Sequence, residues 1–295
     1  MTRKSPRFVL SLLAVPAACA AIVSGCGSDD SGSGSEQPDA GLTAVKSYLT
    51  EHSADLVTQT DALRNAGNDY YDLAKANDFD YAKMLKQDRE AVNAALTEAK
   101  NAFIKANPAY EEMEGIVAGI PRTAQYDTDI DAGSDASDPE SAVSFNLTLP
   151  NGKVMKQPGN LFFLIETSLY GTNDELTVNG VKPDVNGDGK VSFGEGLPEA
   201  NVFKAAVDEI GKQARDLDKD AQEIVITPSD AFTAITVMTP TMSEYFEQWK
   251  LSSFVAGEGN AEEEGFVATS RLSDIADILT GIDFTSAEIE PLIAE

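Results

Sequence analysis

The chain has 295 residues, with 49 acidic against 22 basic side chains, a formal net charge of −27 and 42% hydrophobic residues. Such an excess of negative charge makes nucleic acid and anionic lipid headgroups poor partners, whereas cations are attracted to it. The apolar content suffices for a hydrophobic core, and the length fits one large domain or two modest ones.

The N-terminus has the layout of a secretory signal. Basic residues precede an apolar run over residues 8–23, which is too short and too rich in alanine for a membrane span. The tetrapeptide Val23-Ser24-Gly25-Cys26 resembles the bacterial lipobox, in which an aliphatic and two small residues precede the cysteine that receives the lipid. We therefore predict a signal peptide at residues 1–25 and lipidation of Cys26. An ordinary cleaved signal is the alternative.

Residues 26–40 are predicted to form a flexible tether, because glycine, serine and aspartate dominate them and cannot bury apolar surface. The mature chain would have one thiol and no internal disulfide. These features predict a protein of the cell envelope that is anchored to a membrane through its lipid and faces the periplasm or the cell exterior.

Residues 41–130 are predicted to form a first helical half. Apolar spacing of three and four places one group of residues on a single helix face. This group comprises Leu42, Val45, Leu49, His52, Leu56 and Leu63. A second amphipathic stretch covers residues 84–103. Asn107 as N-cap and Pro108 at the first helical position then predict the start of a new, short helix.

Residues 131–197 are predicted to form a connector, and residues 198–295 a second helical half. Apolar and polar residues alternate over residues 143–149 before an Asn151-Gly152 turn, which predicts a β-hairpin. Helical spacing resumes after the connector, and Gly281 is expected to end the last helix. The predicted fold is therefore all-α, with two helical-bundle halves joined by a connector that contains a β-hairpin and an EF-hand-like calcium loop.

The calcium loop is predicted at residues 184–195, which read DVNGDGKVSFGE and match the EF-hand pattern at every defining position. The expected ligands are the side chains of Asp184, Asn186, Asp188, Ser192 and Glu195 and the backbone carbonyl of Lys190. Prolines and glycines on both flanks oppose the helix pair of a signalling EF-hand. We therefore expect calcium to bind this loop weakly and to stabilise the connector. A turn that binds no metal is the alternative.

A second candidate site centres on Glu166, the one carboxylate in an otherwise apolar, helix-length run over residues 161–171, which is predicted to form a helix within the connector. An unpaired ionised glutamate in such surroundings is costly, so Glu166 should be neutralised, paired or bound to a metal. A glutamate at a locally exposed corner is the alternative, because periodicity does not locate the exposed face.

Several segments resemble the imelysin family. Residues 158–171 resemble its signature, in which a Gly-x-His-x-x-Glu segment runs into an aromatic residue and a glycine. Residues 110–114, the Asp-rich turn at residues 127–131, and residues 245–250 and 266–272 resemble its iron-associated periplasmic branch. The resemblance covers most of residues 42–293, but Phe163 stands where the family has histidine, and Leu161 where it has glycine.

The resemblance implies an all-helical fold with a metal site near the histidine and glutamate, and a connection with iron uptake. Glu166 carries over directly, and the other candidates for this second metal or ligand site are Glu111, Glu114, Asp131 and His52. The alternatives are structural roles without a ligand: the glutamates stabilise a helix dipole, and His52 is a hydrogen-bonded core residue. Phenylalanine coordinates no metal, so we expect weak iron or zinc binding, because oxygen-only sites favour calcium, magnesium or manganese.

Catalytic motifs are sparse, since the sequence has neither a His-Glu-x-x-His nor a Gly-x-Ser-x-Gly pattern. We therefore expect a noncatalytic lipoprotein that binds a metal or another ligand, is linked to iron uptake, and uses calcium together with iron or another divalent metal. The alternatives are an imelysin-type metallopeptidase and a surface interaction module that has kept the fold and lost the metal site.

Overall fold

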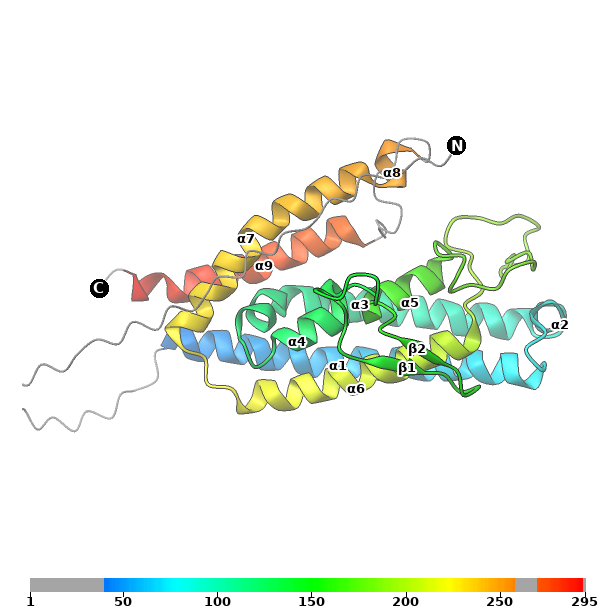
Figure 1. Cartoon of the computed structure of the whole chain (residues 1–295), viewed down its shortest axis with the longest axis horizontal. Helices are drawn as coiled ribbons and strands as arrows, with labels where there is room; N and C mark the ends of the chain where they lie inside the picture. Colours follow the sequence, from blue (N-terminus) through cyan, green and yellow to red (C-terminus); the bar gives the residue numbers. More distant parts are fainter. Residues whose placement is uncertain (1–39, 258–269, 294–295) are drawn as a thin grey trace, which may run out of the picture. The chain divides into compact units, whose positions relative to one another are not determined.

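The computed structural model describes residues 40–257 and 270–293, which belong to one compact unit spanning Pro38–Glu295 (Figure 1). The predicted signal peptide, Cys26 and nearly all of the tether lie outside the described residues. The described chain is mostly helical, as predicted, with one small sheet. None of its helices combines the length and apolar character needed to cross a membrane.

Three long helices pack together and enclose most of the core. They are α1 (Ala40–Ala76), α3 (Arg89–Gly119) and α6 (Ala200–Glu223), and a short α2 (Tyr81–Gln87) precedes α3. The stripe predicted on the first helix is confirmed, because its members Val45, Leu49, Leu56 and Leu63 are fully buried.

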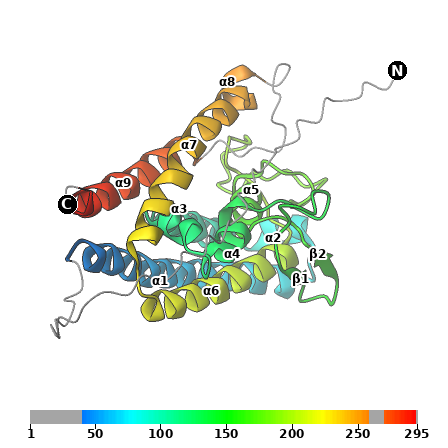
Figure 2. The same ribbon diagram turned by 60° about the vertical axis from the view of Figure 1, so that its left-hand side comes forward.

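Two further helices, α7 (Pro228–Leu251) and α9 (Arg271–Ile289), pack against each other and against α3 (Figure 2). A short α8 (Ser253–Ala256) follows α7, and a 3-10 turn, η2 (Glu290–Leu292), follows α9. A second, smaller group of buried side chains joins α7 to α9: Met238, Met242, Ile275 and Ile278. Because α3 contacts both groups of helices, its side chains can meet residues from distant parts of the sequence. The division into two helical halves stays a prediction.

The predicted helix start at Asn107 is wrong, because α3 runs through this position with Pro108 in its interior. Proline there removes one backbone donor, a cost that burial of the helix outweighs. Phe103, Tyr110 and Met113 are all buried on either side of it. The Asn107 side chain donates a hydrogen bond to Glu111 Oε1 at 2.8 Å instead of capping a helix.

After α3, one helical turn, α4 (Ala124–Asp127), widens into a π-turn, η1 (Thr128–Ala132), which spans the predicted start of the connector. The predicted hairpin is confirmed: β1 (Asn146–Thr148) pairs antiparallel with β2 (Val154–Lys156). Gly152 adopts a φ of +84° in the turn, as the Asn-Gly signal requires.

The apolar run around Glu166 forms a helix, α5 (Leu161–Tyr170). Asn160 caps its N-terminus, because the side chain accepts a hydrogen bond from the Phe163 amide at 2.8 Å. Gly171 ends it in a left-handed conformation with a φ of +68°. The helix therefore has fixed ends and holds Glu166 in a defined position.

Gly281 does not end the last helix as predicted, because α9 continues to Ile289. Its role is close packing: a Cβ atom at this position would lie 1.9 Å from the carbonyl oxygen of Glu112 on α3. The missing side chain lets α9 approach α3 directly beside Glu111 and Glu114.

We expect Gly281→Ala to lower the free energy of unfolding by about 1–3 kcal/mol or more, because the added methyl group forces two packed helices apart. Gly211→Ala is the matched control, since a Cβ atom there meets side-chain atoms only at 3.6 Å and beyond. Alanine in a helix interior should then leave stability unchanged or raise it. Urea unfolding of both variants measures the difference, and equal midpoints would contradict the proposed contact.

Candidate metal centre

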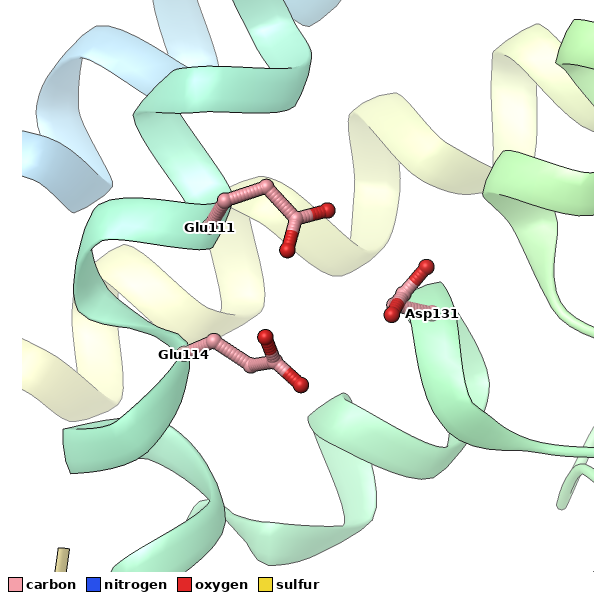
Figure 3. A group of neighbouring side chains, drawn as sticks. All are labelled: Glu111, Glu114 and Asp131. Carbon is pink, nitrogen blue, oxygen red and sulfur yellow. The ribbon is translucent and has the colours of Figure 1, made fainter. Parts of the chain in front are cut away.

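Three carboxylates come together where α3 meets the π-turn. Glu111 and Glu114 lie three residues apart on α3 and therefore share a face, and Asp131 comes from η1. One oxygen from each lies within 4.8 Å of the others, and the side chains point toward one another (Figure 3). π-Turns frequently occur at functional sites, and this one projects Asp131 toward α3.

These carboxylates are poorly satisfied by the protein. Glu111 and Glu114 have exposed fractions of 0% and 1%. Asn107 donates to Glu111 Oε1, and the Tyr245 hydroxyl donates to Glu114 Oε1 at 3.4 Å. Within the described residues, Glu111 Oε2, Glu114 Oε2 and Asp131 Oδ2 have no hydrogen-bond partner. Buried polar atoms are normally paired, so these three oxygens have capacity for a further ligand.

Glu166 and Asp274 extend the cluster, which brings α5 and α9 into it. Glu166 is only 4% exposed, so the exposed-corner interpretation does not hold. Its Oε2 accepts a hydrogen bond from Ser270 Oγ at 3.3 Å. Oε1 of Glu166 and Oδ1 of Asp274 also have no partner in the described part of the chain. Four segments far apart in the sequence thus contribute carboxylates to one buried region.

Burial makes these groups weak acids. Loss of solvation, followed by the repulsion between neighbouring carboxylates, raises the pKa of Glu166 to about 8 and the pKa of Asp274 to about 6. The same causes raise the pKa values of Glu111 and Glu114 well above their usual range. At neutral pH and without a bound metal, a pKa of about 8 favours the protonated form of Glu166.

Arg271, at the start of α9, supplies a positive charge at the edge of the cluster. Its Nη1 lies 3.7 Å from Asp274 Oδ2, and its guanidinium carbon lies 4.1 Å from the centre of the Tyr245 ring. Its charge opposes the rise in the pKa values of Glu111, Glu114 and Glu166.

His52 does not join this cluster. Its Nε2 lies 3.3 Å from Oε2 of Glu112, which occupies a different face of α3 from Glu111 and Glu114. Tyr48 donates to the same carboxylate oxygen. The cluster therefore contains oxygen donors and no imidazole, because His52 on α1 points toward the half-exposed side of α3.

Asp274 and Arg271 were not predicted as site residues. Both enter through the packing of α9 on α3, which local spacing does not encode. The available signal for them was a basic and an acidic residue, three positions apart, at the start of the helix that follows Ser270. Asp129 has a structural role instead, because it accepts hydrogen bonds from the amide and hydroxyl of Ser144.

The loop at residues 184–195 is closed by its own first residue. Asp184 accepts hydrogen bonds from the amides of Gly187 at 2.9 Å and Gly189 at 3.2 Å. Both glycines have positive φ, +78° and +88°, which only glycine adopts at low cost. Arg89 on α3 forms an ion pair with Asp184 at 3.4 Å. The sharp turn expected at Gly189 is therefore present.

The last residue of this loop turns back to its centre. Glu195 accepts hydrogen bonds from the amides of Asn186 at 3.3 Å and Ser192 at 2.7 Å. As predicted, no helix flanks the loop, because α5 ends at Tyr170 and α6 begins only at Ala200. The loop has no helix pair to open or close.

The raised pKa values predict that the metal-free protein loses stability as the pH rises from 5 to 8. The unfolded chain releases these protons near pH 4, whereas the folded protein retains them, so rising pH favours unfolding. Glu166→Gln should make the slope shallower, because one titrating carboxyl is gone, whereas the exposed Glu175→Gln should not. Melting temperatures in chelator at four pH values test this, and parallel slopes for all three proteins would contradict it.

The whole described chain resembles one protein family. Residues 41–294 match the family model of imelysin, peptidase family M75. No curated protein and no solved structure matches the chain significantly. Because the match extends from the second residue of α1 to beyond the end of α9, the chain belongs to the imelysin family.

Proposed function

We propose that this protein is an exported lipoprotein that binds a metal cation without catalysis and is linked to iron uptake. The binding site is the cluster in which Glu111, Glu114 and Asp131 supply ligands, with Glu166 and Asp274 beside them. The observation that carries this proposal is the set of five carboxylate oxygens in this region that have no hydrogen-bond partner among the described residues.

The energetics of burial support a cation here. Removing several carboxylates from water is unfavourable unless their charge is neutralised, either by protons or by a positive partner. A proton shared between two carboxyls satisfies only that pair, whereas one metal ion binds several oxygens at once. A divalent ion that displaces these protons would satisfy both the charge and the free oxygens.

The ligand chemistry favours a hard cation. The cluster offers carboxylate oxygens, which suit magnesium, calcium and manganese, whereas zinc and ferrous iron prefer sites that include imidazole or thiolate. Phe163, which stands where the family has its histidine, lies one turn before Glu166 on α5 and has no ligand atom. We therefore expect the ligand types of this cluster to suit manganese, magnesium or calcium, and Mn²⁺ serves as the probe below.

The sequence before the described residues supports the location. The lipobox-like Val23-Ser24-Gly25-Cys26 is followed by a Gly/Ser-rich stretch, which suits a domain tethered to a lipid. The link to iron uptake rests on the segments that resemble the iron-associated branch of the family.

The competing function is that of a metallopeptidase, because the imelysin family is named as peptidase family M75. A zinc peptidase usually binds its metal through histidines, and the cluster contains none. Cleavage of an unfolded protein substrate that stops on chelation and is lost in Glu114→Gln would favour the peptidase over our proposal.

We expect Mn²⁺ to bind the purified soluble domain, and Glu114→Gln to weaken that binding at least tenfold, about 1.4 kcal/mol, because one charged ligand is lost. Glu112→Gln is the matched control, since Glu112 lies on the same helix but faces His52 and Tyr48. It should bind Mn²⁺ as the parent does. Calorimetric titration at pH 8 measures all three, and equal affinities for the parent and Glu114→Gln would refute the site.

We also propose that the loop at residues 184–195 binds calcium and stabilises the connector. Its complete set of ligand types, the conformations of its glycines and the inward orientation of Asp184 and Glu195 support this.

Saturating calcium should therefore raise the melting temperature, because a ligand that binds only the folded state stabilises it by mass action. Glu195→Gln should remove most of this gain, since the loop loses its bidentate ligand. The exposed Glu175→Gln, which lies outside the loop, should keep the gain. A parent protein with the same melting curve in calcium and in chelator would exclude a calcium role for the loop.

A further inference from the structure

Arg271 brings a positive charge to the edge of the acidic cluster. Its charge acts on the carboxyls of Glu111, Glu114, Asp131, Glu166 and Asp274. These residues come from α3, η1, α5 and α9, so one guanidinium at the first turn of α9 interacts with carboxylates from four segments. Such a charge lowers the cost of burying these acids when no metal is bound.

Two contacts place the Arg271 guanidinium at this edge. Its Nη1 forms an ion pair with Asp274 Oδ2 at 3.7 Å, which is longer than the about 2.7–2.9 Å of a close charge-assisted hydrogen bond. The guanidinium also stacks on Tyr245, which is half-buried at the edge of the cluster. The Arg271 side chain is 15% exposed, and its neighbour Leu272 is exposed.

A metal ion and this guanidinium compete for the same carboxylates. Two positive groups in the same partly buried region repel each other strongly, because little water screens them. The carboxylates that a metal would bind are also those whose negative charge holds Arg271 in place. Binding of the metal therefore removes most of the attraction that keeps the guanidinium at the cluster.

We propose that Arg271 is an internal counter-cation that a metal displaces on binding, so that this side chain sets the metal affinity of the site. This inference rests on the metal-binding function proposed above and adds its regulation. In the metal-free protein Arg271 stabilises the cluster, and in the metal-bound protein it turns outward and leaves the carboxylates to the metal. The affinity is thereby held lower than the carboxylates alone would give.

The test compares Arg271→Gln with the parent in Mn²⁺ titrations followed by the electron paramagnetic resonance of free Mn²⁺, and in melting curves with chelator or with Mn²⁺. We expect at least tenfold tighter Mn²⁺ binding, a lower melting temperature in chelator, and recovery of that loss in Mn²⁺. Arg122→Gln is the matched control: Arg122 pairs with Asp220 and Glu223 on the surface, away from the cluster. It should leave Mn²⁺ affinity unchanged.

Arg271→Lys keeps the positive charge but loses the planar group that stacks on Tyr245, so it should bind Mn²⁺ with an affinity between those of the parent and Arg271→Gln. This variant also provides the test if Arg271→Gln does not fold. Equal or weaker binding in both variants, with Mn²⁺ still bound by the parent, would overturn displacement and leave the metal site intact. A parent that binds no Mn²⁺ would overturn both the proposed function and the displacement.

Discussion

The burial of several carboxylates between α3, the π-turn, α5 and α9 is the constraint on which the arrangement of these elements depends. Each of them contributes at least one acid to the region, and loss of solvation raises the pKa values of all of them. Such a region costs stability unless protons, a guanidinium or a metal ion neutralise it. A fold that retains this arrangement therefore carries a cost that a bound cation removes.

The helix packing around the cluster supports its geometry. α3 continues through Pro108, which keeps Asn107 and Glu111 on one rigid helix where the amide can orient the carboxylate. Gly281 lets α9 touch the backbone of α3 at Glu112, between Glu111 and Glu114. This contact determines the position of α9 along the axis of α3, and it thereby brings Asp274 to the cluster. The packing of the helices therefore also determines where the carboxylates of the cluster lie.

The sequence predicted the parts that depend on local signals and missed those that depend on packing. The stripe on α1, the hairpin at Asn151-Gly152 and the helix around Glu166 all follow from spacing and turn chemistry. Glu111, Glu114 and Asp131 were candidates because of a family resemblance. Pro108 and Gly281 led to wrong helix boundaries, since both are local signals of a helix terminus that burial overrides. Asp274 and Arg271 reach the cluster only through long-range contacts between helices.

The central claim, that the carboxylate cluster holds a metal, is tested most directly by a crystal structure of the soluble domain grown with Mn²⁺. An anomalous difference map collected at the manganese edge would locate the ion without assumptions about its ligands. We predict a peak among Glu111, Glu114 and Asp131, within about 2.6 Å of a carboxylate oxygen from each. A map with no peak at this cluster, from crystals with saturating Mn²⁺ at pH 8, would contradict the claim.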